Sequence, residues 1–359
     1  MQASDMQASG PVNTHDIVVI GASAGGVEAI TTVLAGLPRD LRAAVLVVLH
    51  ISRGRSVLPE IISRVSRLPA AHPQDGDELH YGHIYVAPPD HHLTVDGTRV
   101  RVQHGPSENG VRPAVDPLFR SAARTFGPRV VGVVLTGALD DGTAGLAAVK
   151  EAGGIAVVQD PEEAFSPSMP RSAMNLVPVD HVLPLREIPV LITSLALETA
   201  PNERHHTAPH LAPIEPDHSE ASIAFTQDDR PGQLSVYSCP ECHGSLWETD
   251  DLGILRFRCR VGHVYSSDSM LAAQTDSVDR ALWAALRSLE ERASLTKKMA
   301  DRARERQHGW VANAFEGRSR EAQQHAAVVR EMLINRTSGH DVPEDTVEPV
   351  APVTERLDR

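Results

Sequence analysis

The segment DIVVIGASAGGVEAI, residues 16–30, restricts the possible folds of this chain more than any other stretch. It starts with a β-branched run typical of a buried strand, turns through small residues at 21–26, and has apolar residues at helical spacing from Val27 onward. Ser23 therefore lies at a strand–turn–helix corner, in the pattern G-x-S-x-G. Such a corner raises the hydroxyl out of the sheet, and free N–H groups at the helix start, including that of Ala24, can bind an oxyanion.

Two other interpretations of this corner remain open. The same residues nearly form a dinucleotide-binding fingerprint, Gly21-x-Ser23-x-x-Gly26, which requires an acidic residue at the end of the next strand. The next predicted strand, 43–49, is followed by His50 instead. The second alternative is a Gly-rich turn with a structural role only.

Charge and hydropathy exclude two classes of partner. The 359 residues carry a formal charge of -13, whereas a nucleic-acid-binding surface is basic, so we expect no nucleic-acid partner. No apolar run approaches the roughly 20 residues that span a bilayer, so we expect a protein that is not membrane-embedded. Residues 1–15 are polar and lack the apolar core of a signal peptide, which predicts a disordered N-terminus and a cytoplasmic location.

Strand and helix patterns alternate from residue 16 to about residue 200. This alternation predicts an α/β fold with a doubly wound, mostly parallel sheet. The fold class expected for the whole chain adds a small zinc-ribbon-like module, which follows from the cysteine spacing described below, and a C-terminal helical segment. Asp96-Gly97 predicts a hairpin turn. The expected strands are 16–20, 43–49, 83–87, 93–95, 99–103, 129–135, 154–159 and 181–183, and the expected helices are 27–37, 56–66, 115–126, 142–152, 170–176 and 185–197.

Composition divides the chain into six parts. We expect a disordered N-terminus at 1–15, a catalytic domain at 16–200, a flexible linker rich in Pro, His and acidic residues at 201–232, a zinc-ribbon-like module at 233–266, a helical segment at 267–336 and a disordered tail at 337–359. In the helical segment one apolar stripe is expected, and Gly309 and Gly317 are the candidate breaks of a helical hairpin. The stripe consists of Leu282, Leu286, Leu289, Ala293 and Leu295.

Polar residues follow three of the predicted strands, at the sheet edge where doubly wound proteins bind ligands. Ser23 follows the first strand, His50 the second, and Asp140-Asp141 the strand at 129–135. A serine needs a base to become a nucleophile, so these groups suggest a nucleophile, a general base and a carboxylate that orients the imidazole. Alternatively, His50 is a structural strand-end histidine and the aspartates cap a helix. His91 and His92 are rival bases, expected in a loop.

Five blocks in collinear order resemble the catalytic domain of the chemotaxis protein-glutamate methylesterases, the CheB family, over about residues 16–197. They are GASAGGVEAI, His50, GPSENGVRPAVDPLFRSAA, LTGALDDGTAGL and QDPEEAFSPSMPRSAM. The resemblance implies hydrolysis of glutamyl methyl esters on methylated chemoreceptors or receptor-like proteins, with release of methanol, and in many relatives deamidation of glutamine. It implies no catalytic cofactor and places the catalytic triad on Ser23, His50 and Asp141.

This chemistry also needs donors for the tetrahedral oxyanion. The candidates are backbone N–H groups at Ala24 and in the 137–139 turn, at Ala138 and Leu139. Residues 105–116 either line a substrate groove or form a surface loop. Many relatives carry Met-Gly where this chain has Ala138-Leu139, so the shape of the pocket is expected to differ.

Better-known members carry an N-terminal receiver domain, and with about 15 residues before the first strand we expect no phosphorelay control within this chain.

All three cysteines lie in residues 239–259, and the spacing C-x₂-C…C-x₃-H is that of a zinc ribbon. The expected ligands of a structural zinc ion are Cys239, Cys242, Cys259 and His263, with two short strands around 251–253. His243 is the alternative histidine ligand, and a redox-active or reduced thiol cluster is the alternative to a metal site.

The helical segment is interpreted either as a solvated hairpin or as a docking or dimerisation element. In the second case the C-terminal region is expected to recognise a partner methyltransferase or signalling protein. Two alternative functions remain for the whole chain. It is either a non-catalytic or retargeted partner-binding module, or a small-molecule esterase that uses the same triad.

Overall fold

The computed structural model describes residues 14–51, 54–201 and 232–338, which belong to two compact units divided after Ala273. Most of the predicted N-terminal segment 1–15, linker 201–232 and tail 337–359 therefore lies outside the described residues. None of the described helices is both long enough and apolar enough to cross a bilayer.

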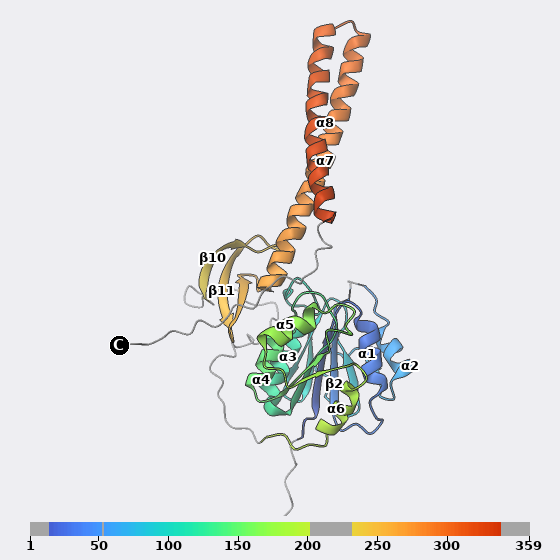
Figure 1. Cartoon of the computed structure of the whole chain (residues 1–359), viewed down its shortest axis with the longest axis vertical. Coiled ribbons are helices and arrows are strands. Elements are labelled where there is room, and N and C mark those ends of the chain that lie inside the picture. Colours follow the sequence, from blue (N-terminus) through green and yellow to red (C-terminus); the bar gives the residue numbers. More distant parts are fainter. Residues whose placement is uncertain (1–13, 52–53, 202–231, 339–359) are drawn as a thin grey trace, which may run out of the picture. The chain divides into compact units, whose positions relative to one another are not determined.

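A seven-stranded, all-parallel sheet forms the centre of the first unit, as the α/β prediction requires (Figure 1). Its strand order is β3-β4-β2-β1-β7-β8-β9. The five inner strands are rich in Val, Ile and Ala and are buried on both faces, which is the usual pattern of a covered parallel sheet, whereas the edge strands β3 and β9 are partly exposed. Their bounds are β1 (Ile17–Ala22), β2 (Ala44–Leu49), β3 (Ala70–Ala71), β4 (Ile84–Val86), β7 (Val130–Val134), β8 (Ile155–Gln159) and β9 (His181–Leu183).

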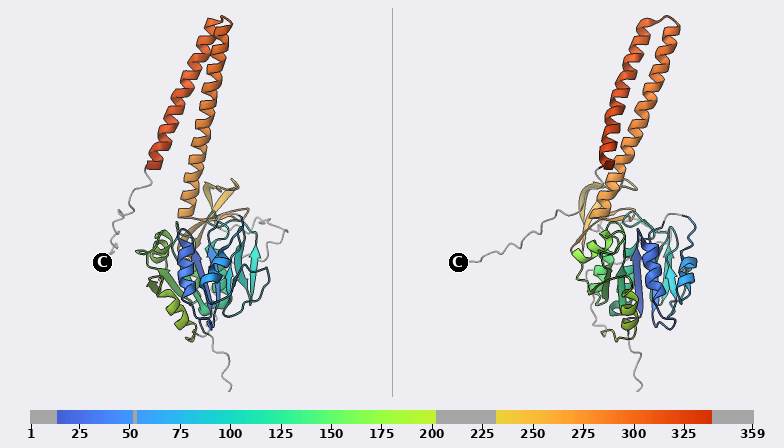
Figure 2. Two further views of the ribbon diagram at one scale, coloured as in Figure 1. Left: turned by 90° about the vertical axis from the view of Figure 1, so that its right-hand side faces the viewer. Right: turned by 45° about the vertical axis from the view of Figure 1, so that its right-hand side comes forward.

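Helices cover both faces of this sheet (Figures 1 and 2). Residues of α1, α2 and α6 form one apolar core with the sheet, and residues of α3, α4 and α5 form a second core on the other face. The helices are α1 (Gly26–Ala35), α2 (Leu58–Val65), α3 (Val115–Phe126), α4 (Thr143–Glu151), α5 (Ser168–Leu176) and α6 (Ile188–Leu195). A 3₁₀ turn, η1 (Gly127–Arg129), follows α3.

The strand order changes direction at β1. Strands β2 and β4 extend the sheet on one side of β1, and β7 and β8 extend it on the other. The ends of β1, β2 and β7 consequently meet at a topological switch point, where ligands bind in this class of sheet. This is the edge at which the sequence places Ser23, His50 and the two adjacent aspartates.

The predicted hairpin forms beside the sheet. Strands β5 (His92–Asp96) and β6 (Arg99–Gln103) pair antiparallel around Asp96-Gly97, and the φ of 55° at Gly97 suits a glycine. His92 is the first residue of β5 and is buried, so the prediction of a loop histidine was wrong for this residue. The short strand β3 was not predicted, because two alanines carry no strand pattern.

The cysteine segment folds as a four-stranded antiparallel sheet in the first unit. The predicted strands around 251–253 are β11 (Ser245–Asp251) and β12 (Ile254–Cys259), and β10 (Gln233–Ser238) and β13 (Val264–Ser266) complete the sheet. We call residues 233–266 the cysteine module. Its small core contains Leu246, Phe257 and Tyr265, whereas Ile254 packs into the core that α3 and α4 form with the parallel sheet.

Two long helices, α7 (Ser267–Glu305) and α8 (Gly309–Ser338), make up the described part of the second unit, with the first turns of α7 counted in the first unit. The chain turns just before Gly309, whereas Gly317 lies inside α8, so the second suggested break was wrong. Leu286 packs against Ala326 and Leu333, but Leu295 is 60% exposed and does not belong to the apolar stripe.

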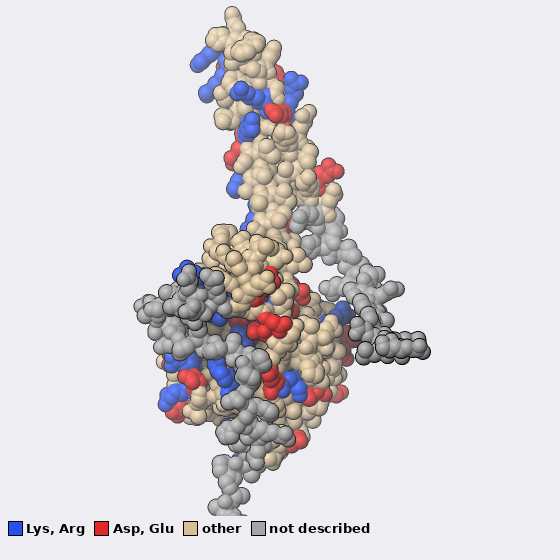
Figure 3. All heavy atoms as spheres, turned by 90° about the vertical axis from the view of Figure 1, so that its left-hand side faces the viewer, with Lys and Arg blue, Asp and Glu red and all other residues tan. Residues whose placement is uncertain are grey.

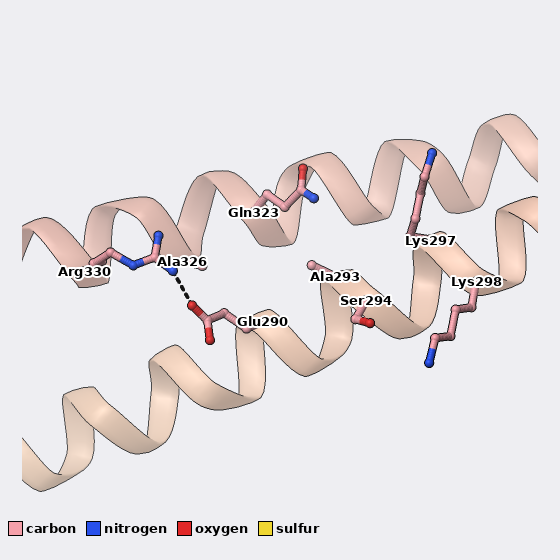
Figure 4. Close-up of a pocket in the computed structure, with 8 residues that line it drawn as sticks. All are labelled: Glu290, Ala293, Ser294, Lys297, Lys298, Gln323, Ala326 and Arg330. Carbon is pink, nitrogen blue, oxygen red and sulfur yellow. Dashed lines mark hydrogen bonds and ion pairs between the residues drawn. The ribbon is translucent and has the colours of Figure 1, made fainter.

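Lys, Arg, Asp and Glu side chains are scattered over the helical unit, and the rest of its visible face consists of other residues (Figure 3). Glu290 forms an ion pair with Arg330 across the two helices, and Lys297 forms one with Glu316 at 3.2 Å. A shallow pocket between α7 and α8 is lined by small and charged residues and contains none of the predicted site residues (Figure 4).

Candidate active site and cysteine cluster

Ser23 follows β1 directly at the switch point. Its N–H donates to the carbonyl of Thr136 at 2.9 Å, and its carbonyl accepts from Gly26 N–H at 2.9 Å, so the turn is bonded to the end of β7 and to the start of α1. Gly25 has a φ of 74°, a left-handed conformation that favours glycine. The G-x-S-x-G pattern is thus explained by backbone geometry, and the serine side chain is half-buried at the sheet edge.

His50 occupies the matching position on β2. Ala22 and Leu49 are register partners, and His50 N–H donates to the carbonyl of Ala22 at 3.1 Å, so Ser23 and His50 each come one residue after a paired position of adjacent strands. Nε2 of His50 lies 2.7 Å from Oδ2 of Asp141. The structure brings His50 and Asp141 together, and between the two described residues Ser23 and His50 it forms no side-chain hydrogen bond.

The carboxylate of Asp141 lies at the N-terminus of α3. Besides His50, it accepts hydrogen bonds from the N–H groups of Val115 at 2.6 Å and Asp116 at 3.2 Å, and from the Asn109 amide at 2.9 Å. Burial opposes the charged form of Asp141. The hydrogen bond to His50, the charge of the His50 imidazole and the Val115 N–H together outweigh burial and lower the pKa of Asp141. Asp141 is therefore a carboxylate at neutral pH, held by four donors.

Asp140 has a different environment although it is the adjacent residue. Its Oδ1 accepts a 2.7 Å hydrogen bond from the hydroxyl of Ser266 in the cysteine module. Burial raises the pKa of Asp140 to about 6, against the opposing effect of the Ser266 hydroxyl. Neither aspartate is the N-cap of α4, because that position belongs to Gly142.

The cap of α4 comes instead from Asp116, a role that the sequence analysis missed. Oδ1 of Asp116 accepts from the N–H groups of Gly142 at 3.1 Å and Gly145 at 2.7 Å, which ties the start of α4 to the start of α3. Burial raises the pKa of Asp116 to about 7, while the guanidinium of Arg256 opposes that increase. No sequence signal marked this residue, because an acidic residue in the first turn of a helix is common.

Asn109 and Glu108 were also missed, although they lie in the 105–116 block. The amide of Asn109 donates to both Asp141 and Asp116, and Glu108 accepts two bonds of 2.7 Å from Arg120. Burial alone would raise the pKa of Glu108, but Arg120 and Arg256 hold it well below its usual range. This part of the block is buried, so it is not the surface loop that the sequence analysis left open.

The candidate oxyanion donors differ in their surroundings. Ala24 follows Ser23 in the turn, and its carbonyl accepts from the Thr136 hydroxyl at 2.9 Å. Ala138 and Leu139 are exposed beyond the end of β7, and Leu139 has a φ of 62°. The N–H of Gly137, in contrast, already donates to the carbonyl of Ser166 at 2.9 Å.

Both rival histidines contact backbone groups. His92 contacts the carbonyl of Pro106 at 3.0 Å through Nε2 and accepts from Ala114 N–H at 3.2 Å through Nδ1. Both of its ring nitrogens therefore bind backbone, and burial lowers its pKa. His91 contacts the carbonyl of Pro89 at 2.9 Å.

The four predicted metal ligands form one cluster. The donor atoms of Cys239, Cys242, Cys259 and His263 lie within 4.8 Å of one another, and the Sγ atoms of Cys242 and Cys259 are 3.6 Å apart. Donors bound to a tetrahedral zinc ion at about 2.0–2.3 Å have separations of this size. His243 is exposed and is not a member of the cluster.

Two further features of the cluster bear on its chemistry. A hydrogen bond from Cys259 lowers the pKa of Cys239 to about 4, and the same contact raises that of Cys259. Nε2 of His263 lies 3.3 Å from a carboxylate oxygen of Glu241, the outer contact that metal-binding histidines usually make. The donor set and spacing thus fit a closed Cys₃His metal site.

Comparison with known proteins relates the first half of the chain to one family. A family model described as CheB methylesterase matches residues 18–192. A Geobacter metallireducens protein named protein-glutamate methylesterase/protein-glutamine glutaminase 4 is 44% identical over 184 residues, which make up 50% of this chain and 53% of that protein. The chain thus spans about half the length of this relative and of a second one, from Anaeromyxobacter dehalogenans.

Two other relatives are covered almost completely. A Leptospira interrogans protein, provisionally named protein-glutamate methylesterase/protein-glutamine glutaminase, is 37% identical over 183 residues, which make up 50% of this chain and 95% of that protein. The crystal structure of the Thermotoga maritima CheB methylesterase catalytic domain is 34% identical, with 98% of that chain and 50% of this one covered and a TM-score of 0.48. The match at 37% identity over nearly a whole relative leads to one conclusion: the chain belongs to the CheB methylesterase family.

Proposed function

We propose that this protein is a serine hydrolase that removes methyl esters from glutamate γ-carboxylates of methylated chemoreceptors or similar proteins, with release of methanol. Membership of the CheB methylesterase family and the names of the relatives support this activity. The observation that carries it is the 2.7 Å contact of His50 with Asp141 beside the end of β1, where Ser23 lies. Deamidation of glutamine is a second reaction of the same site, because an amide and an ester give the same acyl-enzyme.

In the proposed mechanism Ser23 is the nucleophile, His50 the general base and acid, and Asp141 the group that orients the imidazole. Nε2 of His50 is bonded to Asp141, so Nδ1 is the nitrogen that takes the proton from the Ser23 hydroxyl. The hydroxyl oxygen attacks the ester carbonyl, and His50 then returns the proton to the leaving methoxide, which departs as methanol. Water, activated by the same imidazole, hydrolyses the acyl-enzyme.

Backbone N–H groups bind the developing oxyanion in this mechanism. Ala24, Ala138 and Leu139 are the proposed donors, since each lies in a turn next to Ser23 or beyond β7. One such donor is worth roughly 10²–10³ in rate. Two exposed apolar side chains suit a peptide substrate better than a small polar one: Leu139, in the turn beyond β7, and Phe165, which lies between β8 and α5 and next to Gly25 of the serine turn.

The cysteine module is proposed to hold one structural zinc ion through Cys239, Cys242, Cys259 and His263. A full set of four protein ligands leaves no open position for catalysis, so the metal takes no part in the ester chemistry. Reduced thiols are needed for this site, which supports a cytoplasmic location. We keep residues 16–200 as the catalytic domain and the helical segment as a candidate docking element for a methyltransferase or signalling protein.

Methanol release from methylated receptor membranes tests the proposal. The full chain should release methanol, and Ser23→Ala should abolish the release while its melting temperature stays close to that of the wild type. Ser194→Ala, which changes an exposed serine of α6, is the matched control and should keep the wild-type rate. Undiminished release by Ser23→Ala would rule out the proposed nucleophile, and turnover of simple esters without preference for methylated peptide would favour a small-molecule esterase.

A further inference from the structure

A buried arginine of the cysteine module lies against the acidic residues that surround Asp141. Arg256, on β12, has 1% of its side chain exposed. Its Nη1 lies 3.2 Å from Oδ2 of Asp116, and its Nη2 donates to Glu108. A buried guanidinium is tolerated only when it is paired, so these two carboxylates and Arg256 depend on one another.

A second connection runs through the side chain of Asn109. Its carbonyl oxygen accepts from Ser266 N–H at 3.0 Å and from the Ser269 hydroxyl at 3.2 Å. Its amide nitrogen donates to Asp141 at 2.9 Å and to Asp116 at 3.1 Å. The backbone N–H of Ser266 can only donate, so it fixes which end of the amide faces Asp141. One side chain therefore joins β13 and the first turn of α7 to the carboxylate that contacts His50.

The backbone strengthens this connection. Asn109 N–H donates to the carbonyl of Val264 at 2.7 Å, and Glu108 and Val264 form a parallel bridge, so residues 107–109 run beside β13 like an added strand. The Ser107 hydroxyl donates to Glu241, whose other carboxylate oxygen lies 3.3 Å from Nε2 of His263. A chain of polar contacts thus leads from His263 through Glu241 and residues 107–109 to Asp141.

We propose that Asn109 is a positioning residue for Asp141, and that the folded cysteine module holds this arrangement in place, so that turnover depends on the module. Ser266 anchors Asn109, and Arg256 anchors Asp116. The inference rests on the proposed function, because it assigns Asp141 to the orientation of His50. Asn109 holds Asp141 directly, and Arg256 holds Asp116, whose N–H also bonds Asp141. A displacement of about 1 Å at a catalytic group reduces rates about 10²-fold, so a loosened anchor has a measurable effect.

The first experiment compares Arg256→Met with Arg256→Lys and with Arg260→Met, an exposed arginine of the same module, in the full chain. We measure kcat and KM for methanol release and express kcat per active serine, which is titrated with a fluorophosphonate. Arg256→Met should lower kcat per active serine about 10- to 100-fold with little change in KM. Arg256→Lys should recover part of the loss, and Arg260→Met should match the wild type. A wild-type kcat per active serine in Arg256→Met would overturn the proposal, because a purely structural role changes only the number of active molecules.

The second experiment tests Asn109 and its coupling to Arg256. Asn109→Ala removes one donor to Asp141, so the acid limb of the kcat/KM profile should move to higher pH. In the double variant with Arg256→Met, the loss should be smaller than the product of the two single losses, because both side chains act through the same carboxylates. Losses that multiply in full would show two independent effects and contradict the proposal.

A substrate-free measurement separates this inference from the proposed function. The low-field NMR signal of the His50 Nε2 proton reports the His50–Asp141 hydrogen bond without any ester. We expect Arg256→Met and Asn109→Ala to shift or broaden it and Arg260→Met to leave it unchanged. If the wild type releases no methanol, the proposed function fails, and this signal alone decides the coupling: an unchanged signal in both variants overturns it.

Discussion

The Ser266 hydroxyl donates a 2.7 Å hydrogen bond to Asp140, whereas the next residue in the chain, Asp141, contacts His50 at the same distance. Two adjacent carboxylates thus serve two different parts of the molecule. Asp140 faces the cysteine module and has a raised pKa, and Asp141 faces the imidazole and has a lowered one. This contrast gives the first two predictions.

Asp141→Asn should lower kcat for methanol release by roughly 10³–10⁴, because an amide no longer holds the imidazole in the tautomer that accepts the serine proton. Asp140→Asn keeps an acceptor for the Ser266 hydroxyl and should retain most of the wild-type rate. Steady-state assays of the two variants, at equal active-serine concentration, check the prediction. Equal losses in both variants would argue against a distinct role for Asp141.

Asp140 should make the stability of the protein depend on pH. Its folded-state pKa is about 6, above the ordinary 3.8, so the folded protein retains a proton that the unfolded chain loses. The free energy of unfolding of the wild type minus that of Asp140→Asn should therefore be highest below about pH 4. It should fall by about 3 kcal/mol at most between pH 4 and 6, and it should stay constant above about pH 6. Urea unfolding of both proteins across this range gives the difference. A difference that grows with pH would mean that the carboxylate form is the stabilised one.

Gly137→Ala should impair the serine corner. A Cβ built at Gly137 would lie 2.0 Å from the sulfur of Met169 and 2.8 Å from Cβ of Ser23, and Met169 is fully buried. The added methyl must displace the nucleophile or the packing of α5, so we expect kcat to fall at least about 10-fold and the melting temperature to drop. Gly317→Ala, where nothing lies within 4 Å of the new methyl, is the control. Wild-type kinetics in Gly137→Ala would show that the turn tolerates expansion.

The cysteine cluster should bind one zinc ion per chain. His263→Ala should reduce the zinc content measured by inductively coupled plasma mass spectrometry, whereas His243→Ala, at an exposed histidine outside the cluster, should not. Structural zinc provides about 10–16 kcal/mol of folding free energy in small zinc-finger peptides, so chelation should unfold the module and increase hydrogen exchange in β11 and β12. Retention of full protection after complete zinc removal would mean that the module folds without metal.

The order and type of most elements of the catalytic half follow from local patterns. β-branched runs gave the strands, and apolar residues at helical spacing gave the helices, with α3 matching its predicted bounds of 115–126. Ser23 and His50 were found because each follows a predicted strand, and the carboxyl ends of parallel strands lie at the same edge of a sheet. The clustering of three cysteines with His263 followed from their spacing in the sequence. These signals succeed because they depend on residues that are close in sequence.

Other features had no local signal. Nothing in the pattern ILRFRC distinguishes Arg256, which is buried against Asp116, from Arg258, which is only partly buried. Asn109 reads as a turn residue next to Gly110, yet it holds Asp141. Gly317 reads as a helix break, but α8 continues through it, and two residues later the hydroxyl of Ser319 donates to the carbonyl of Ala293 on α7 at 2.8 Å.

The sequence by itself determined the parallel α/β architecture, the serine corner and the clustered Cys₃His set, because each depends on periodicity or spacing within a short segment. Strand-end position alone left open which of two adjacent aspartates contacts His50, and the family resemblance pointed to Asp141. The tertiary structure shows the physical reason, because N–H groups at the start of α3 hold the Asp141 carboxylate. The tertiary structure also decided that Arg256 contacts Asp116 and that Ser266 contacts Asn109, the two residues that bond to Asp141. The contacts of Arg256 with Asp116 and of Ser266 with Asn109 join residues more than a hundred positions apart. Pairings at that range depend on how the folded chain brings buried charged and polar groups together, and no local sequence pattern records that.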